Sequence, residues 1–179
     1  KQWLIHLTRY FRDRRHSRNY YFQASKNLKL PHYKIPISAL VVIYTKQLDI
    51  LLLSRADKSN FWQSVTGSLE HNESPLETAK REVLEETGII CENYHLQDWN
   101  LSHKYKIFSH WQYRYGPGVD YNIEHIFGLE LPKKVPVTLS PNEHIDFKWV
   151  TLEEAKKTVF SWTNVKALEK LYEIKLLAS

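Results

Sequence analysis

The stretch GSLEHNESPLETAKREVLEETGI (Gly67–Ile89) contains six glutamates, although the chain of 179 residues has a formal net charge of +5. Its start and stop signals predict a helix. Ser74 and Glu77 form a Ser-x-x-Glu capping box, and a proline follows the cap at the first helical position. Gly88 supplies the left-handed residue that commonly ends a helix. The stretch therefore predicts a helix over Pro75–Thr87.

Three of the glutamates crowd one side of this predicted helix. Glu82 and Glu86 are four residues apart, and Glu85 lies beside them. Like charges at this spacing oppose helix formation by roughly a few tenths of a kcal/mol per pair. A divalent cation reverses the sign of that effect, because Mg²⁺ prefers oxygen ligands. The alternative is a solvated acidic face, relieved by Lys80 and Arg81.

The spacing of the stretch resembles the Nudix box. The pattern is Gly67, five residues, Glu73, seven residues, and then REVLEETGI from Arg81 to Ile89. The resemblance implies the Nudix fold, an α/β fold in which a mixed β-sheet is sandwiched between α-helices. It also implies an enzyme that uses Mg²⁺ or Mn²⁺ to hydrolyse nucleoside-diphosphate-linked or related phosphoanhydrides. Gly67 is expected to supply backbone freedom at a loop end.

The same resemblance implies a role for each acidic residue of the site. Glu82 and Glu86 are the expected metal ligands, and Glu143 matches a third ligand that reaches in from a loop. For Glu143 the alternative is an ordinary exposed loop acid. Glu85 is expected as a further ligand or as the general base. Arg81 is expected to orient and neutralise these catalytic carboxylates by bidentate pairing.

Segments outside the box resemble one branch of that family, the bacterial dihydroneopterin triphosphate pyrophosphatases of folate synthesis. They are FWQSVTGS (Phe61–Ser68), IFSHWQYRYGPGV (Ile107–Val119), EHIDFKWV (Glu143–Val150) and SWTNVKALE (Ser161–Glu169). This resemblance implies hydrolysis of 7,8-dihydroneopterin triphosphate to the monophosphate and pyrophosphate.

The residues that match substrate contacts of that branch are Lys34, Arg55, Thr66, Tyr105, Lys106, Ile107, Phe108 and Ser161. Lys34 and Arg55 suit phosphate, and Arg55 would offer its planar fork from a strand end. Either could instead be ordinary surface charge. Ser161 has an equally good structural reason to exist, as the N-cap of the last helix.

A flat pterin ring needs an aromatic or apolar sandwich with a few placed polar groups. The candidate rings, each of which could instead fill the core, are Phe61, Trp62, Phe108, Trp111 and Trp162. Three histidines are expected to be structural or surface groups, because Mg²⁺ prefers oxygen; they are His110, His125 and His144.

Two rival functions stay open at this stage. The first keeps the chemistry but changes the substrate to nucleoside triphosphates, dinucleoside polyphosphates or RNA 5′ ends. The second is a Nudix-like binding module without catalysis. Such modules typically lose box glutamates, whereas this chain retains all of them.

The chain divides into a basic, aromatic N-terminal appendage (1–33) and a domain (34–179). The appendage carries eight basic residues against one acid, which gives 8 − 1 = +7 and leaves 5 − 7 = −2 for the domain. A short surface helix or tail is the simplest interpretation, and a nucleic-acid or membrane-surface contact is the alternative. Neither nucleic acid nor membrane is an expected partner, and the oligomeric state is left open.

Hydrophobic patterning within the domain predicts alternating strands and helices. The expected strands are Ile37–Thr45, Leu48–Arg55, Phe61–Gly67, Tyr94–Asn100, Lys104–Tyr113, Ile123–Leu131 and Phe147–Val150. The expected closing helices are Leu152–Val159 and Thr163–Leu176. The chain has one cysteine, Cys91, which we interpret as core packing and as compatible with the reducing cytoplasm. No apolar run reaches the roughly 20 residues of a membrane span.

Overall fold

The computed structural model describes residues 33–58 and 60–177. The expectations for the appendage therefore lie outside the described residues, apart from Tyr33. From Lys34 onward the chain forms one compact unit.

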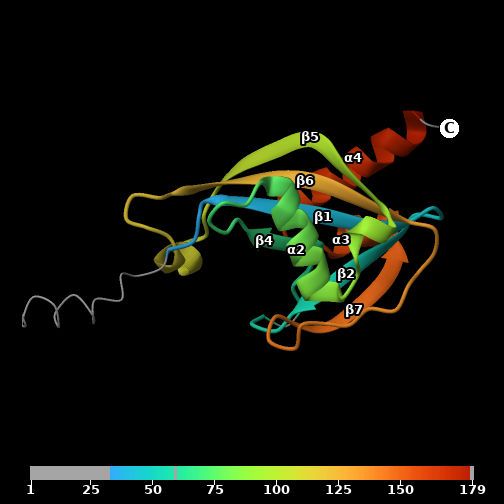
Figure 1. Ribbon diagram of the computed structural model, residues 1–179, viewed down its shortest axis with the longest axis horizontal. Helices are drawn as coiled ribbons and strands as arrows, with labels where there is room; N and C mark the ends of the chain where they lie inside the picture. The colour runs from blue at the N-terminus through green and yellow to red at the C-terminus, as the bar shows by residue number, and fades with distance from the viewer. Residues whose placement is uncertain (1–32, 59, 178–179) are drawn as a thin grey trace, which may run out of the picture. The chain divides into compact units, whose positions relative to one another are not determined.

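The described residues form a seven-stranded mixed sheet (Figure 1). Its main path runs β3-β2-β1-β6-β5, while β4 pairs with β1 and β7 pairs with β2. β1 and β6 are parallel, and the other pairs are antiparallel. The strands are β1 (Ile37–Thr45), β2 (Asp49–Arg55), β3 (Trp62–Gln63), β4 (Val65–Ser68), β5 (His95–Lys106), β6 (Tyr121–Leu131) and β7 (His144–Thr151).

Helices cover both faces of the sheet. Side chains alternate across a strand, so an apolar strand such as β1 presents apolar side chains on both faces, and both need covering. α2 (Pro75–Thr87) packs on one face, and α3 (Leu152–Thr158) and α4 (Trp162–Leu177) pack on the other. Alternate residues of β1 join opposite cores: Leu40, Val42 and Tyr44 on the α4 side, and Ala39, Val41 and Ile43 on the α2 side. The predicted sandwich of a mixed sheet between helices is confirmed.

The two closing helices agree with the sequence expectation to within one residue at each end. Thr151 caps α3, since its hydroxyl accepts from the Glu154 N–H at 3.2 Å. Cys91 is buried in the α2-side core, as expected, at the start of a short 3₁₀ turn, η1 (Cys91–Asn93). None of the helices within residues 33–58 and 60–177 is long and apolar enough to cross a membrane.

The strand expected over Phe147–Val150 begins earlier and is β7 (His144–Thr151), and three other strand predictions were wrong in their limits. The expected strand over Phe61–Gly67 is interrupted between Gln63 and Val65, so that β3 pairs with β2 and β4 with β1. The two strands expected within 94–113 are one strand, β5, whose register with β6 shifts between Asp98 and Leu101. An Asp98 carboxylate accepts the Asn100 N–H at 2.8 Å there, and Asn100 has a positive φ of 49°, so the chain makes a bulge and continues.

The third error lies beyond Lys106, where the predicted strand stops. Ser109–Arg114 is a 3₁₀ helix, η2. Its aromatic residues pack on one another instead of alternating across the sheet: Phe108 and Trp111 meet edge to face with ring centroids 5.4 Å apart. The Trp111 N–H donates to the Phe108 carbonyl at 2.8 Å, which closes the turn.

Candidate active site

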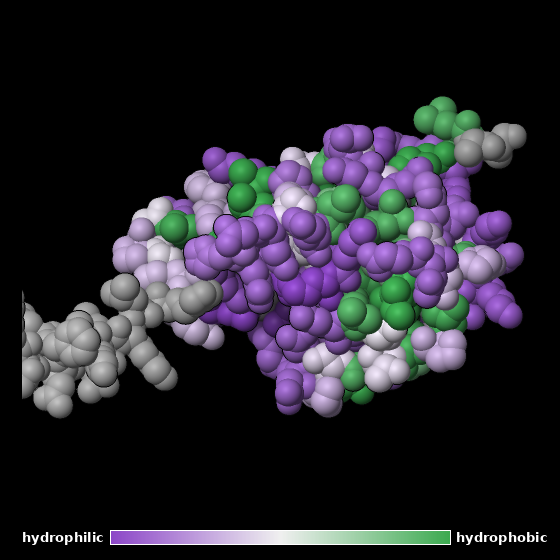
Figure 2. All heavy atoms as spheres, in the orientation of Figure 1, coloured by the Kyte–Doolittle hydropathy of each residue, from purple (hydrophilic) through white to green (hydrophobic). Residues whose placement is uncertain are grey.

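α2 begins and ends where its local signals predict. Ser74 Oγ accepts the Glu77 N–H at 3.3 Å, and Glu77 Oε2 accepts the Ser74 N–H at 2.7 Å. Gly88 has a φ of 70° and donates its N–H to the Leu84 carbonyl at 2.9 Å. The face of the molecule that carries α2 is mostly hydrophilic (Figure 2).

The buried side of α2 is unusual because it carries acids. Glu82 is 9% exposed and Glu86 is 3% exposed, beside the buried Ala79 and Val83. Leu76, which helical spacing places on the inward face, is instead 43% exposed. Burying two carboxylates on one helix costs free energy unless cations or donors compensate them. The fold therefore holds these acids for a reason other than packing.

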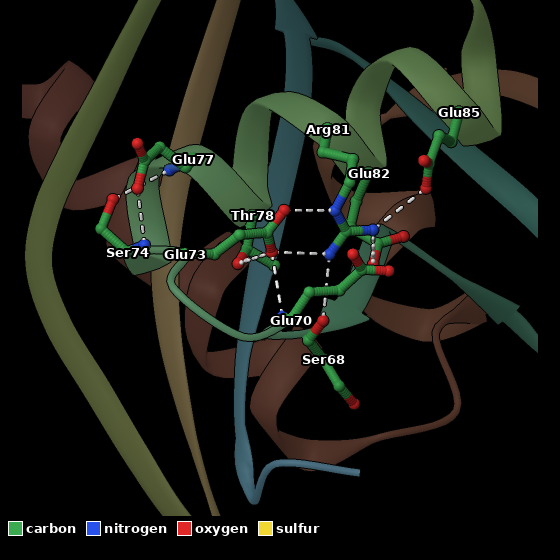
Figure 3. A network of polar contacts seen from close by, with 9 residues as sticks. All are labelled: Ser68, Glu70, Glu73, Ser74, Glu77, Thr78, Arg81, Glu82 and Glu85. Atoms are coloured by element: carbon green, nitrogen blue, oxygen red, sulfur yellow. Dashed lines mark hydrogen bonds and ion pairs between the residues drawn. The ribbon is translucent and has the colours of Figure 1, made fainter. Parts of the chain in front are cut away.

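Arg81 compensates part of this charge (Figure 3). Its Nε donates to Glu73 Oε1 at 2.6 Å, and its Nη2 donates to Glu73 Oε2 at 2.9 Å. Its Nη1 donates to Glu82 Oε1 at 2.8 Å and to Glu85 Oε2 at 3.0 Å. The hydrogen bonds from Arg81 hold the pKa of Glu73 far below its usual value. Arg81 thus ties the start of the loop-helix segment to the acidic face of the helix.

Glu82 lies directly against Gly67 on β4. A Cβ at position 67 would stand 1.7 Å from Glu82 Oε1. The expectation that Gly67 supplies backbone freedom is therefore incomplete, because its φ is not positive and the reason visible here is space for a carboxylate. Burial raises the pKa of Glu82, and Arg81 opposes that shift.

Glu86 lies close to Glu143, which precedes β7, and to His144, the first residue of that strand. One ligand atom each from Glu86, Glu143 and His144 lies within 4.8 Å of the others. Glu86 Oε2 and His144 Nε2 are 3.1 Å apart, but they are not aligned for a hydrogen bond, and neither atom has a hydrogen-bond partner among the described residues. Burial raises the pKa of Glu86 to about 7, against the influence of His144. His144 was expected as a structural or surface group; it is buried and faces this cluster.

The side-chain oxygen and nitrogen atoms of this cluster are suitable ligands for a divalent cation. A buried carboxylate oxygen without a hydrogen-bond partner is costly, and a cation would remove that cost. Two carboxylates provide the oxygen ligands that Mg²⁺ and Mn²⁺ accept, and His144 offers a nitrogen.

The carboxylates open into a cavity of about 400 Å³, which we call the first cavity. It brings together six predicted site residues: Lys34, Arg55, Thr66, Glu82, Glu86 and Glu143. Sequence reasoning missed other residues that line it, among them Asp57, Gln63, Arg114 and Asn142. Burial, with a smaller effect of Arg114, lowers the pKa of Lys34.

Arg55 ends β2, as predicted, but its fork is not free. Its Nε and Nη2 donate to the two carboxylate oxygens of Asp57 at 2.7 and 2.6 Å. Its guanidinium also lies 5.0 Å from the centroid of the Trp111 ring. Any phosphate that binds Arg55 must therefore share it with Asp57 or displace that carboxylate.

A second cavity of about 260 Å³ adjoins the first and shares Arg55, Gln63 and Thr66 with it. It contains the predicted residues Tyr105, Lys106, Phe108 and Ser161. Of the candidate ring-binding aromatics, Phe108, Trp111 and Trp162 line it, whereas Phe61 and Trp62 are not among its lining residues. Ser161 Oγ also accepts the Asn164 N–H at 3.2 Å, which is the capping bond expected for α4.

Three predicted site residues are not among those that line either cavity. Arg81 acts on the carboxylates from behind, and Glu85 is exposed and bonded to Arg81. Ile107 is buried, at 4% exposed.

Sequence reasoning also missed Glu124 in the second cavity. The sequence did contain a signal for it. Glu124 and the core residue Ile126 are two residues apart on β6, so their side chains face the same side of the sheet.

Three comparisons bear on this site. The NUDIX domain family model matches residues 34–171. The dihydroneopterin triphosphate diphosphatase of Escherichia coli strain K12 is 41% identical over 141 residues, 77% of this chain and 93% of that protein. That of Haemophilus influenzae is 43% identical over 141 residues, 77% and 88% of the two chains. The solved structure of the E. coli dihydroneopterin triphosphate pyrophosphohydrolase has a TM-score of 0.72 at 41% identity, covering 77% of this chain and 95% of that one.

Proposed function

This chain belongs to the NUDIX family, and on that premise we propose that it hydrolyses 7,8-dihydroneopterin triphosphate to the monophosphate and pyrophosphate. Relatives named for this activity are 41% and 43% identical over most of the chain. We place the reaction in folate synthesis and in the cytoplasm, where a free thiol such as Cys91 persists.

One observation carries the proposal: a carboxylate-lined cavity adjoins an aromatic-lined one, and three residues belong to both. A molecule with a flat ring at one end and phosphates at the other matches this pair of cavities. The ring would lie near Phe108, Trp111 and Trp162, and the phosphates near Lys34 and Arg55. Thr66, which lines both cavities, would lie beside the linking part of the substrate.

We expect Glu82, Glu86 and Glu143 to hold the divalent cation, Mg²⁺ or Mn²⁺, with His144 close enough to join them. The cation would neutralise phosphate charge and make a water more acidic. Arg81 would keep Glu82 and Glu85 oriented through its hydrogen bonds. Lys34 would bind a phosphate oxygen, which compensates the burial that lowers its pKa. Glu85 remains our candidate for the general base.

The first test is a substrate panel with product identification in ¹⁸O-labelled water. We expect dihydroneopterin triphosphate to give the highest kcat/KM and pyrophosphate to be the product. A clear preference for adenosine polyphosphates or for RNA 5′ ends would replace the pterin as substrate while leaving the phosphate chemistry in place.

The second test addresses the metal ligands with a matched pair of variants. Glu86→Gln should lower kcat by a factor on the order of 100 or more, because it removes a buried anionic ligand while preserving shape. Glu92→Gln is the control, since Glu92 is exposed and its carboxylate pairs with Lys80 at 3.1 Å, at the surface. Normal turnover of Glu86→Gln would refute the ligand assignment.

A further inference from the structure

β6 carries a carboxylate into the second cavity. Glu124 is 4% exposed, whereas its neighbour Ile123 is 40% exposed, so the acidic side chain points inward and the aliphatic one outward. Glu124 Oε2 has no hydrogen-bond partner among the described residues. Burial raises its pKa to about 7, and the hydroxyls of Thr163 and Thr66 oppose the shift only in part.

The surroundings of Glu124 leave this oxygen available to a ligand. Asn164 also lines the second cavity, but both polar atoms of its side-chain amide already have hydrogen-bond partners. Its Oδ1 accepts the Ser64 N–H at 2.8 Å, and its Nδ2 donates to Ser161 Oγ at 2.8 Å. None of the ion pairs found within the described residues involves Glu124.

The rest of the lining suits a planar ring. The rings of Phe108, Trp111, Phe160 and Trp162 all contribute to it. A carboxylate in an aromatic cavity is costly when unpaired, and it binds strongly to two adjacent N–H donors presented in one plane.

We infer that Glu124 determines ring specificity by accepting two hydrogen bonds from a 2-amino-4-oxopyrimidine edge, whose exocyclic NH₂ and adjacent ring N–H both donate. The inference rests on the proposed function, because that function assigns the phosphates to the first cavity and the ring to the second. The same edge occurs in pterins and in guanine. A ring with an oxygen in place of the amino group would turn an acceptor toward the carboxylate and would be rejected.

The experiment compares pterin with lumazine, which carries oxygen where pterin carries the 2-amino group. Binding to the full chain is followed by ligand fluorescence, so hydrolysis is not required. We expect the unmodified chain to bind pterin about 10- to 100-fold more tightly, because an unpaired buried donor or acceptor costs about 1–3 kcal/mol. Glu124→Gln should reduce that ratio to about one.

Glu130→Gln is the matched control, since Glu130 lies on the same strand but is paired with Lys175, and it does not belong to either cavity. It should retain the full preference for pterin. Equal affinities for the two rings in the unmodified chain would overturn the inference without any variant. An unchanged ratio in a folded Glu124→Gln protein would also overturn it.

Failure of the proposed function has a different signature. A chain that does not hydrolyse dihydroneopterin triphosphate, yet prefers pterin in a Glu124-dependent way, refutes the substrate and supports the role of Glu124. Hydrolysis of dihydroneopterin triphosphate and GTP is measured in parallel. A preference for GTP that Glu124→Gln abolishes would support the same role with guanine as the ring.

Discussion

At the scale of single residues, the contact between Gly67 and Glu82 places α2 against the sheet. Any side chain at position 67 would overlap the Glu82 carboxylate, because even a Cβ would lie 1.7 Å from its Oε1. We expect Gly67→Ala to lower kcat/KM by a factor on the order of 100, since a displacement of about 1 Å at a reacting centre has this effect. Mn²⁺ affinity, measured by calorimetry, should fall with it.

Gly128→Ala is the control for this prediction. A Cβ at Gly128 would stand 2.1 Å from Trp99 Cζ2, so the clash is similar but lies in the core and away from the cavities. Gly128→Ala should lower the melting temperature and leave the Mn²⁺ affinity of the folded protein unchanged. If both variants lost only stability, Gly67 would have no specific role in placing Glu82.

Arg81 supports a second prediction at this scale. Arg81→Lys keeps the positive charge but cannot reproduce the paired hydrogen bonds to Glu73 together with those to Glu82 and Glu85. We expect a loss of about 1–3 kcal/mol in the free energy of unfolding, measured by urea denaturation, and a lower kcat. Lys80→Gln is the neighbouring control and should leave the unfolding midpoint unchanged. A fully active and stable Arg81→Lys protein would show that charge alone suffices.

At the scale of elements, the buried Glu124 of β6 should make the stability of the fold depend on pH. The pKa of Glu124 is raised from 4.5 to about 7, so the folded chain holds this proton more tightly than the unfolded chain. The stability linked to that proton is fully present below about pH 4.5 and is lost as the pH rises through about 7. The nearby Tyr105 and Tyr115, whose pKa values burial raises, stay neutral throughout this window.

Glu124→Gln removes this dependence. The free energy of unfolding of the variant should therefore fall less than that of the unmodified chain between about pH 5 and about pH 8, by about 1–3 kcal/mol. Chemical denaturation of the metal-free proteins across that range measures the difference. Glu86 titrates in the same window, but it is present in both proteins and cancels in the comparison. Parallel curves would show that Glu124 is ionised in the folded chain throughout.

The secondary-structure elements differ in how well their limits could be predicted from the sequence. α2 was predicted to the residue because its capping box, Pro75 and Gly88 act within one turn of each end. β5 was not, because its bulge depends on the register with β6 and on a local bond from Asn100 to Asp98. The turn after Lys106 depends on packing between aromatic rings, which periodicity does not reveal.

Some residues of the candidate site could likewise be predicted from the sequence, and others could not. The spacing of the box and the resemblance identified Glu82, Glu86 and Glu143, which the fold brings to one cavity. The pairing of Arg55 with Asp57 was missed, and so was the inward direction of Glu124, although its alternation with Ile126 along β6 was readable from the sequence. His144 was expected as a structural or surface group, and its burial beside Glu86 could not be predicted from the sequence because the two residues lie on different elements.

At the scale of the whole molecule, the described residues that line the two cavities all lie at or after position 34. Both hydrophobic cores are also built from residues beyond that point. We therefore expect that the proposed reaction does not need the basic appendage, whose net charge is +7. We propose residues 34–179 as the catalytic domain and predict that a chain beginning at Tyr33 hydrolyses dihydroneopterin triphosphate with kcat/KM within about twofold of the full chain.

Starting at Tyr33 matters, because the Lys34 N–H donates to the Arg114 carbonyl at 2.9 Å and must remain an amide. RNA binding by both chains, measured across a salt series, gives the complementary result. We expect no difference between them, since nucleic acid is not part of the proposed reaction. Salt-dependent RNA binding by the full chain alone would assign the appendage a role in nucleic-acid contact, because phosphate contacts weaken steeply as salt rises. A loss of activity above about tenfold on truncation would instead place the appendage in the catalytic unit and contradict the boundary.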